Sequence, residues 1–290
     1  MPRLQSRFRY VARLWQLPLL ECNNAECGRA RRAWRRFSDG AKSIQLHGER
    51  YCFPDCFEQE VQRRFAEMSV FYEPAPRASH RVPLGLLMLS RGDLTNVQLR
   101  QVIDAQRDSG RGRIGEWVRK LAGEHQVTAA LALQWSCPTL KVLPPCAAEC
   151  GIPLHLLKQF CMAPVHFLRT SRVLHVAFGH QIEYRVLHAI EQMLECKTEG
   201  CLTTPTALEL LLENMERPAT PSEKLFDGRR GPKEMAGITS SYAAKLLADE
   251  VRTVSCAEFI WVRIKGGRGT ADLLFPLTDT QLLPAAKFSP

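Results

Sequence analysis

The stretch PLGLLMLSRGDLTNVQLRQVIDAQ occupies residues 83–106, and a related stretch, RIGEWVRKLAGEHQVTAALALQ, occupies residues 113–134. Each copy begins with an aliphatic residue and glycine, passes a second glycine and ends on glutamine. In the first copy, Gly92 is suited to end a short helix in the left-handed conformation. Thr95 and Gln98 then have the spacing of a capping box at the start of a second helix. The first copy is therefore predicted to be a helix, a tight turn and a helix.

The second copy repeats this pattern in a shorter form. Gly123 takes the place of the turn glycine, and an apolar face follows at helical spacing up to Gln134. Between Gly123 and Val127 this copy is about two residues shorter than the first. Pro138 stops the last helix, because proline lacks the N–H group that a helix interior requires. The two copies predict a tandem helical-hairpin repeat over residues 83–143.

These residues carry a family resemblance. The repeat resembles the amino-terminal domain of type II secretion and type IV pilus assembly ATPases. The shared features are a Leu-Gly or Arg-Ile-Gly start, a turn glycine, spaced leucines and a terminal glutamine. The resemblance covers roughly residues 83–217, and one branch of that family binds cyclic di-GMP through two tandem copies. It implies a ligand site in which glycine amides approach phosphate, arginine contacts phosphate or guanine, and glutamine contacts a base edge. The residues implied are Leu84, Gly85, Gly92, Gln106, Arg113, Gly115 and Gln134.

The first copy departs from the family pattern. Pro83 stands where the ligand-binding version carries arginine, although Arg81 lies two residues earlier. The alternative stays open that the glycines are turn residues and the glutamines cap helices in a module that binds only proteins. The resemblance implies partners among secretion or pilus machinery proteins in either case.

The fold class predicted for the whole chain is α+β. Residues 144–217 are expected to form a small α/β subdomain of the same secretion-ATPase-like module, with the order α-β-β-α-β-α. Residues 232–277 are expected to form a separate α-β-β segment, with a long helix over 233–252 followed by two strands. The first 71 residues form a basic segment that contains closely spaced cysteines.

Four cysteines of this first segment predict a structural zinc site. Cys22 and Cys27 form one pair, and Cys52 and Cys56 form a second pair about 25 residues later. Two thiol pairs on two turns fit a tetrahedral zinc knuckle of the zinc-ribbon or treble-clef kind, and His47 is a spare candidate ligand. The alternative is that these cysteines are buried thiols without a metal.

Charge and missing motifs limit the function classes. Residues 1–81 hold 15 Lys and Arg against 9 Asp and Glu, so this part carries +6 of the net charge of +9. Five arginines around Trp34 in residues 28–37 support a rival hypothesis, a zinc-knuckle protein that binds nucleic acid, although no recognisable DNA-reading helix accompanies them. The chain has no Gly-Lys dipeptide and hence no phosphate loop, and it lacks the HExxH and GxSxG patterns. We therefore expect a non-enzymatic regulatory or adaptor protein, located in the cytoplasm and without membrane insertion.

Overall fold

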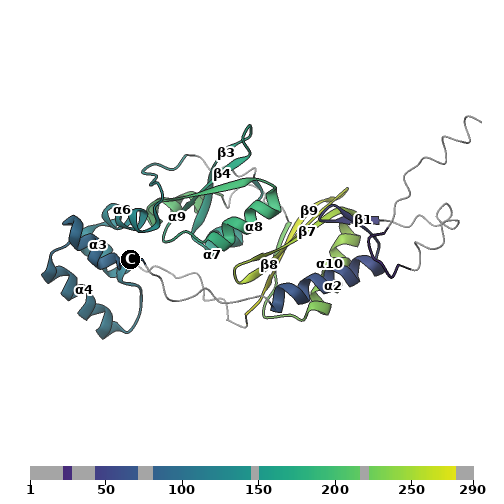
Figure 1. Cartoon of the computed structure of the whole chain (residues 1–290), viewed down its shortest axis with the longest axis horizontal. Coiled ribbons are helices and arrows are strands. Elements are labelled where there is room, and N and C mark those ends of the chain that lie inside the picture. The colour runs from purple at the N-terminus through teal and green to yellow at the C-terminus, as the bar shows by residue number, and fades with distance from the viewer. Residues whose placement is uncertain (1–21, 28–42, 71–80, 145–149, 216–221, 279–290) are drawn as a thin grey trace, which may run out of the picture. The chain divides into compact units, whose positions relative to one another are not determined.

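The computed structural model describes residues 22–27, 43–70, 81–144, 150–215 and 222–278. Helices and strands both contribute substantially, which confirms the α+β class (Figure 1). The chain divides into two compact units. The first contains the described residues up to Ala66 together with Pro232–Arg252 and Ile264–Gly269, and the second contains the remaining described residues. None of the described helices is long and apolar enough to cross a membrane.

Four helices follow the tandem sequence pattern and confirm the two predicted hairpins. They are α3 (Leu84–Arg91), α4 (Asn96–Ser109), α5 (Ile114–Ala122) and α6 (Glu124–Trp135). Gly92 ends α3 with φ 77°, and its amide donates to Leu89. The Thr95 side chain accepts a hydrogen bond from the Gln98 amide at 3.2 Å, and the Gln98 side chain accepts one from the Thr95 amide at 2.8 Å, so the capping box is present. The local sequence chemistry of the first copy therefore forms as expected.

The shortening of the second copy has a simple structural form. Gly123 with φ 86° serves both as the residue that ends α5 and as the residue that precedes α6. No separate turn stands between the two helices, whereas residues 92–95 separate α3 from α4. Both hairpins share one core, made of aliphatic side chains from all four helices and the first turn: Leu84, Met88, Leu94, Leu99, Val102, Val118, Val127 and Ala130.

The segment that follows has the predicted order α-β-β-α-β-α. Its elements are α7 (Leu154–Gln159), β3 (Met162–Leu168), β4 (Val173–Phe178), α8 (Tyr184–Leu194), β5 (Lys197–Leu202) and α9 (Pro205–Met215). β3 and β4 lie side by side as an antiparallel pair (Figure 1). β4 also pairs in parallel with β5. The buried face of α8, from Val186 to Met193, contributes to the apolar core around these strands.

The remaining strands form one six-stranded sheet with the order β2-β1-β7-β8-β9-β6. Its elements and the accompanying helices are β1 (Ser43–Leu46), β2 (Glu49–Cys52), α2 (Asp55–Val70), β6 (Ser222–Leu225), α10 (Pro232–Leu246), β7 (Ala248–Cys256), β8 (Phe259–Gly266) and β9 (Gly269–Pro276). β1 pairs in parallel with β7, through Gln45 opposite Glu250 and Leu46 opposite Val251.

One sequence prediction for this region is wrong. The helix expected over residues 233–252 ends at Leu246, and β7 begins at Ala248. Leu247, with φ 52°, makes the turn between them. The sequence ADEVR has helical propensity, but pairing of Glu250 and Val251 with β1 outweighs that local preference. Three strands therefore follow α10 where two were expected.

Candidate functional site

The two hairpins meet at the starts of α3 and α5 in a reciprocal way. A Cβ atom on Gly85 would lie 2.7 Å from Leu99 of its own copy and 3.5 Å from Ile114 of the other copy. A Cβ atom on Gly115 would lie 3.3 Å from Leu84 of the other copy. Gly115 thus allows close packing of the two helix starts, whereas the tight contact at Gly85 is with Leu99 of the same hairpin and its distance to Ile114 is an ordinary van der Waals contact. The sequence motif therefore builds a two-copy arrangement in which the first turns of α3 and α5 are neighbours.

The terminal glutamines make a matching exchange between the copies. Gln106 Nε2 donates to the carbonyl oxygen of Gly112 at 2.9 Å, just before the start of α5. Gln134 Nε2 donates to the carbonyl oxygen of Val82 at 2.6 Å, just before the start of α3. Each glutamine is thus hydrogen-bonded to the main chain just before the first helix of the other copy. These contacts engage the amide nitrogens, so a contact to a base edge would use the amide oxygens or displace the present bonds.

The predicted ligand residues thus fall into four groups. The first, Leu84, Gly85 and Gly115, lies in the helix packing at the two first turns. Gly92 is the left-handed residue after α3, and the glutamines form the exchange described above. Arg113 precedes α5 as its exposed N-cap residue. The equivalent position before α3 is Pro83, which has no donor.

Arg113 and Arg119 connect the second hairpin to the segment between β4 and α8. Arg113 Nη1 donates to Gln181 Oε1 at 3.0 Å, and Arg119 Nη2 lies 3.1 Å from His180 Nδ1. Burial lowers the pKa of His180, and the neighbouring positive charges of Arg119 and Arg113 lower it further. The neutral imidazole then accepts the hydrogen bond from Arg119. Sequence reasoning missed these contacts because their partners lie more than 60 residues apart.

Arg81 does not take over the position of the missing arginine before α3. Its guanidinium lies 3.4 Å from the centroid of the Trp135 ring, in a cation–π contact with the end of α6. Trp135 in turn contacts Tyr184 at a centroid distance of 6.1 Å. Arg81 is therefore held at the end of the second copy, next to the Gln134 contact.

A cavity of about 500 Å³ lies beside α5 and the first turn of α9. Its walls carry charges of both signs, from Arg111, Arg119 and Lys120 and from three glutamates. Thr206 Oγ1 donates to Glu124 Oε1 across it at 2.8 Å. The equal numbers of positive and negative side chains give this cavity no preference for an anion.

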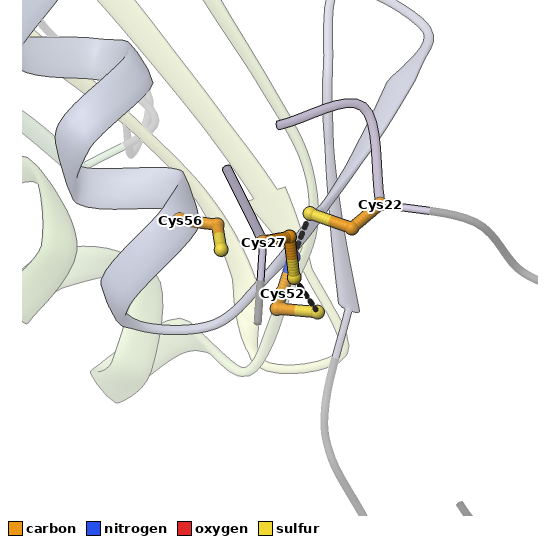
Figure 2. A group of neighbouring side chains, drawn as sticks. All are labelled: Cys22, Cys27, Cys52 and Cys56. Atoms are coloured by element: carbon orange, nitrogen blue, oxygen red, sulfur yellow. Dashed lines mark hydrogen bonds between the residues drawn. The ribbon is translucent and has the colours of Figure 1, made fainter. Parts of the chain in front are cut away.

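The four cysteines predicted as metal ligands come together in the first unit (Figure 2). Cys22 and Cys27 lie in the segment before the β1–β2 hairpin, Cys52 ends β2, and Cys56 is in the first turn of α2. Their sulfur atoms all lie within 4.8 Å of one another, and Cys27 Sγ is 3.9 Å from Cys52 Sγ. Zinc–sulfur bonds of about 2.3 Å in a tetrahedron place sulfur atoms about 3.8 Å apart. The donor type and spacing therefore fit a four-thiolate metal site.

The surroundings of the cysteines support the same interpretation. The Cys52 amide donates to Cys22 Sγ at 3.4 Å, so a backbone N–H group points at the cluster. Burial raises the pKa of Cys52 to about 11 and that of Cys56 to about 12, and the neighbouring thiols contribute. A divalent cation would favour the thiolate form of these sulfur atoms, because metal binding releases the thiol protons. His47 is not part of the group of potential ligands found in the described residues.

The other thiols of the described residues have the character of core side chains. Burial raises the pKa of Cys137, raises that of Cys161 to about 11 and raises that of Cys201 to about 12. Thiols with raised pKa values are poor nucleophiles at neutral pH, because the thiolate is the reactive form. The arginine-rich stretch 28–37, which carries the nucleic-acid hypothesis, lies outside the described residues.

Comparison with known proteins adds similarity over about half of the chain. No family model and no curated protein matches the sequence. Among solved structures, a structure of MshE with cyclic di-GMP shares 21% identity and covers 47% of this chain and 99% of that chain, with a TM-score of 0.39. The N-terminal domain of XpsE shares 18% identity and covers 45% of this chain and 91% of that chain, with a TM-score of 0.33.

Proposed function

We propose that the chain is a non-enzymatic regulatory or adaptor protein whose tandem hairpins bind cyclic di-GMP and which engages secretion or pilus machinery. The observation that supports this most is that the first turns of α3 and α5 are neighbours: a Cβ atom on Gly115 would lie 3.3 Å from Leu84, and one on Gly85 would lie 3.5 Å from Ile114. First-turn amides of a helix have no acceptor within the helix, and the helix dipole favours negative charge there. Two neighbouring first turns suit a ligand that carries two phosphates.

The second copy should contribute most of the affinity. Arg113 offers a guanidinium at the start of α5, whereas Pro83 offers neither a side-chain donor nor an amide N–H at the start of α3. A charge-assisted hydrogen bond from Arg113 to phosphate contributes about 1.5–3 kcal/mol. The proposed site is consequently asymmetric, and weaker than one with an arginine before both helices.

Calorimetric titration of the full chain with cyclic di-GMP tests this function. We expect weak binding by the wild type, tighter binding by Pro83→Arg and no binding by Arg113→Ala. Arg169→Ala is a matched control, because Arg169 follows β3 and lies outside the hairpins. Absence of binding by both the wild type and Pro83→Arg contradicts nucleotide binding. A parallel titration with duplex DNA at two salt concentrations tests the rival function, since binding through phosphates weakens steeply with salt.

We also propose zinc as a structural ion held by Cys22, Cys27, Cys52 and Cys56. The support is the close approach of the four sulfur atoms described above. The four cysteines lie before, within and after the β1–β2 hairpin, so a bound metal would connect segments that are distant in sequence. Metal binding would therefore stabilise the local fold.

Elemental analysis of the purified chain tests the zinc proposal. We expect about one zinc per chain in the wild type and in Cys137→Ser, a control cysteine outside the cluster, and much less in Cys27→Ser. Titration with cobalt should produce thiolate-to-cobalt absorption in the wild type that is weakened by Cys27→Ser. A wild-type chain without stoichiometric metal, purified without chelator and also failing to bind added zinc or cobalt, rules the site out.

A further inference from the structure

The side chain of Gln181 is connected to the arginine on which the proposed nucleotide site depends. Gln181 Oε1 accepts a hydrogen bond from Arg113 Nη1 at 3.0 Å. The residue lies in the segment between β4 and α8, 68 positions after Arg113, and is half-buried. This contact therefore comes from the α/β subdomain and not from either hairpin.

Gln181 is itself held in place. Its Nε2 group donates to Glu183 Oε1, and Glu183 is the N-cap residue of α8. The main-chain carbonyl of Glu183 accepts hydrogen bonds from Val186 at 3.0 Å and Leu187 at 3.1 Å. The donor Arg113 and the acceptor Glu183 orient the amide of Gln181, with its oxygen toward Arg113 and its nitrogen toward Glu183.

The contact leaves the charge of Arg113 available. A guanidinium carries five N–H donors, and the bond to Gln181 occupies one nitrogen with a neutral acceptor. Arginine is also among the side chains that lose most rotamer freedom when they bind a ligand. A partner that orders Arg113 beforehand, without neutralising it, reduces that loss on binding.

A second contact keeps the segment close to the hairpin independently of Arg113. Arg119 Nη2 pairs with His180 Nδ1, and Thr206 pairs with Glu124. The neighbourhood of Gln181 is thus maintained when Arg113 or Gln181 is replaced, and a variant at either position should keep its fold.

We propose that Gln181 is a positioning residue of the cyclic dinucleotide site, so that the α/β subdomain completes a site whose ligand-contacting groups belong to the hairpins. The proposal rests on the proposed function of the hairpins. Gln181 acts through Arg113 and does not touch the ligand itself.

Calorimetry in the Pro83→Arg background tests this, because that variant should bind tightly enough for weakened derivatives to be measured. We expect Gln181→Ala to weaken cyclic di-GMP binding about three- to tenfold, the range that one hydrogen bond to a neutral group contributes. Gln192→Ala is the matched control, since Gln192 is exposed on α8 and pairs with His188. It should leave the affinity unchanged. Adding Gln181→Ala to Arg113→Ala should cause no further loss.

The outcomes separate the two proposals. Unchanged or tighter binding by Gln181→Ala, or an equal loss with and without Arg113, overturns the positioning role and leaves nucleotide binding standing. Absence of binding by every variant overturns the function and the positioning role together. Nuclear magnetic resonance relaxation of the Arg113 Nε–H group gives a readout without ligand. Its motion should increase in Gln181→Ala and stay unchanged in Gln192→Ala, and equal motion in all three proteins contradicts the proposed ordering.

Discussion

Asp272 on β9 should be the most sensitive single position in the C-terminal strands. Its carboxylate accepts hydrogen bonds from Trp261 Nε1 at 2.7 Å, Arg263 Nε at 2.8 Å and Arg263 Nη2 at 2.9 Å. Asp272 is 1% exposed and Arg263 is 6% exposed. Asp272→Ala would remove the carboxylate beside the buried guanidinium of Arg263. Of the hydrogen bonds described for that guanidinium, the one to the carbonyl oxygen of Gly151 would remain.

The expected cost follows from that unpaired charge. Removing one partner of a buried ion pair costs about 3–5 kcal/mol of unfolding free energy. Asp249→Ala, at an exposed position on β7, should change the unfolding free energy by less than about 0.5 kcal/mol. Adding Arg263→Met to Asp272→Ala should recover much of the loss, because it removes the charge that was left unpaired.

Urea unfolding of the full chain, followed by circular dichroism, measures these differences. An unfolding free energy of Asp272→Ala within about 1 kcal/mol of the wild-type value would refute the reasoning, because a buried arginine without a counter-charge destabilises the fold by more than that. A double variant less stable than Asp272→Ala alone would also refute it, since the cost would then arise from packing and not from charge.

Two further predictions concern the hairpins and their neighbours. Gln134→Ala should lower the unfolding free energy by about 0.5–1.5 kcal/mol, because it removes the hydrogen bond to Val82. Gln126→Ala, at an exposed site on α6, should leave the unfolding free energy nearly unchanged. Equal effects of the two variants in thermal unfolding would contradict a stabilising role of the hydrogen bond between the copies. Because the folded pKa of His180 is lowered from its ordinary value of 6.5, the unfolded state binds its proton more readily, and the wild type should lose stability as the pH falls from 6.5 through the folded value. His180→Gln should lack this component, and identical stability–pH profiles for the two proteins contradict the assignment.

Local sequence chemistry predicted much of the second unit. Thr95 and Gln98 signalled a helix start, Gly92 signalled a helix end, and both form as expected. The cysteine spacing also predicted a cluster that the structure assembles. Such features depend on neighbouring residues, or on a residue type with few roles, and are therefore visible in a single sequence.

Contacts between distant segments were not predictable in the same way. The sequence predicts helix at the start of β7, because the pairing of this strand with β1 joins Gln45 to Glu250, which lie far apart in the sequence. The sequence pattern of the cysteine-bearing segment does not predict the strands β1 and β2 or the helix α2. The bond between Arg113 and Gln181 likewise leaves no periodic or spacing signal, because any glutamine in a connecting segment has the same appearance in the sequence.

The most direct test of the central claim is to map backbone amide chemical shifts of the full chain during titration with cyclic di-GMP. The proposed site predicts the largest changes at the first turns of α3 and α5, at Leu84, Gly85, Ile114 and Gly115, with saturable behaviour. Changes at α3 and α5 should follow the same binding curve, because one ligand contacts both helix starts, and both should be lost in Arg113→Ala, which removes the arginine before α5. Absence of changes at both helix starts under ligand excess, or changes confined to another surface, would contradict the account.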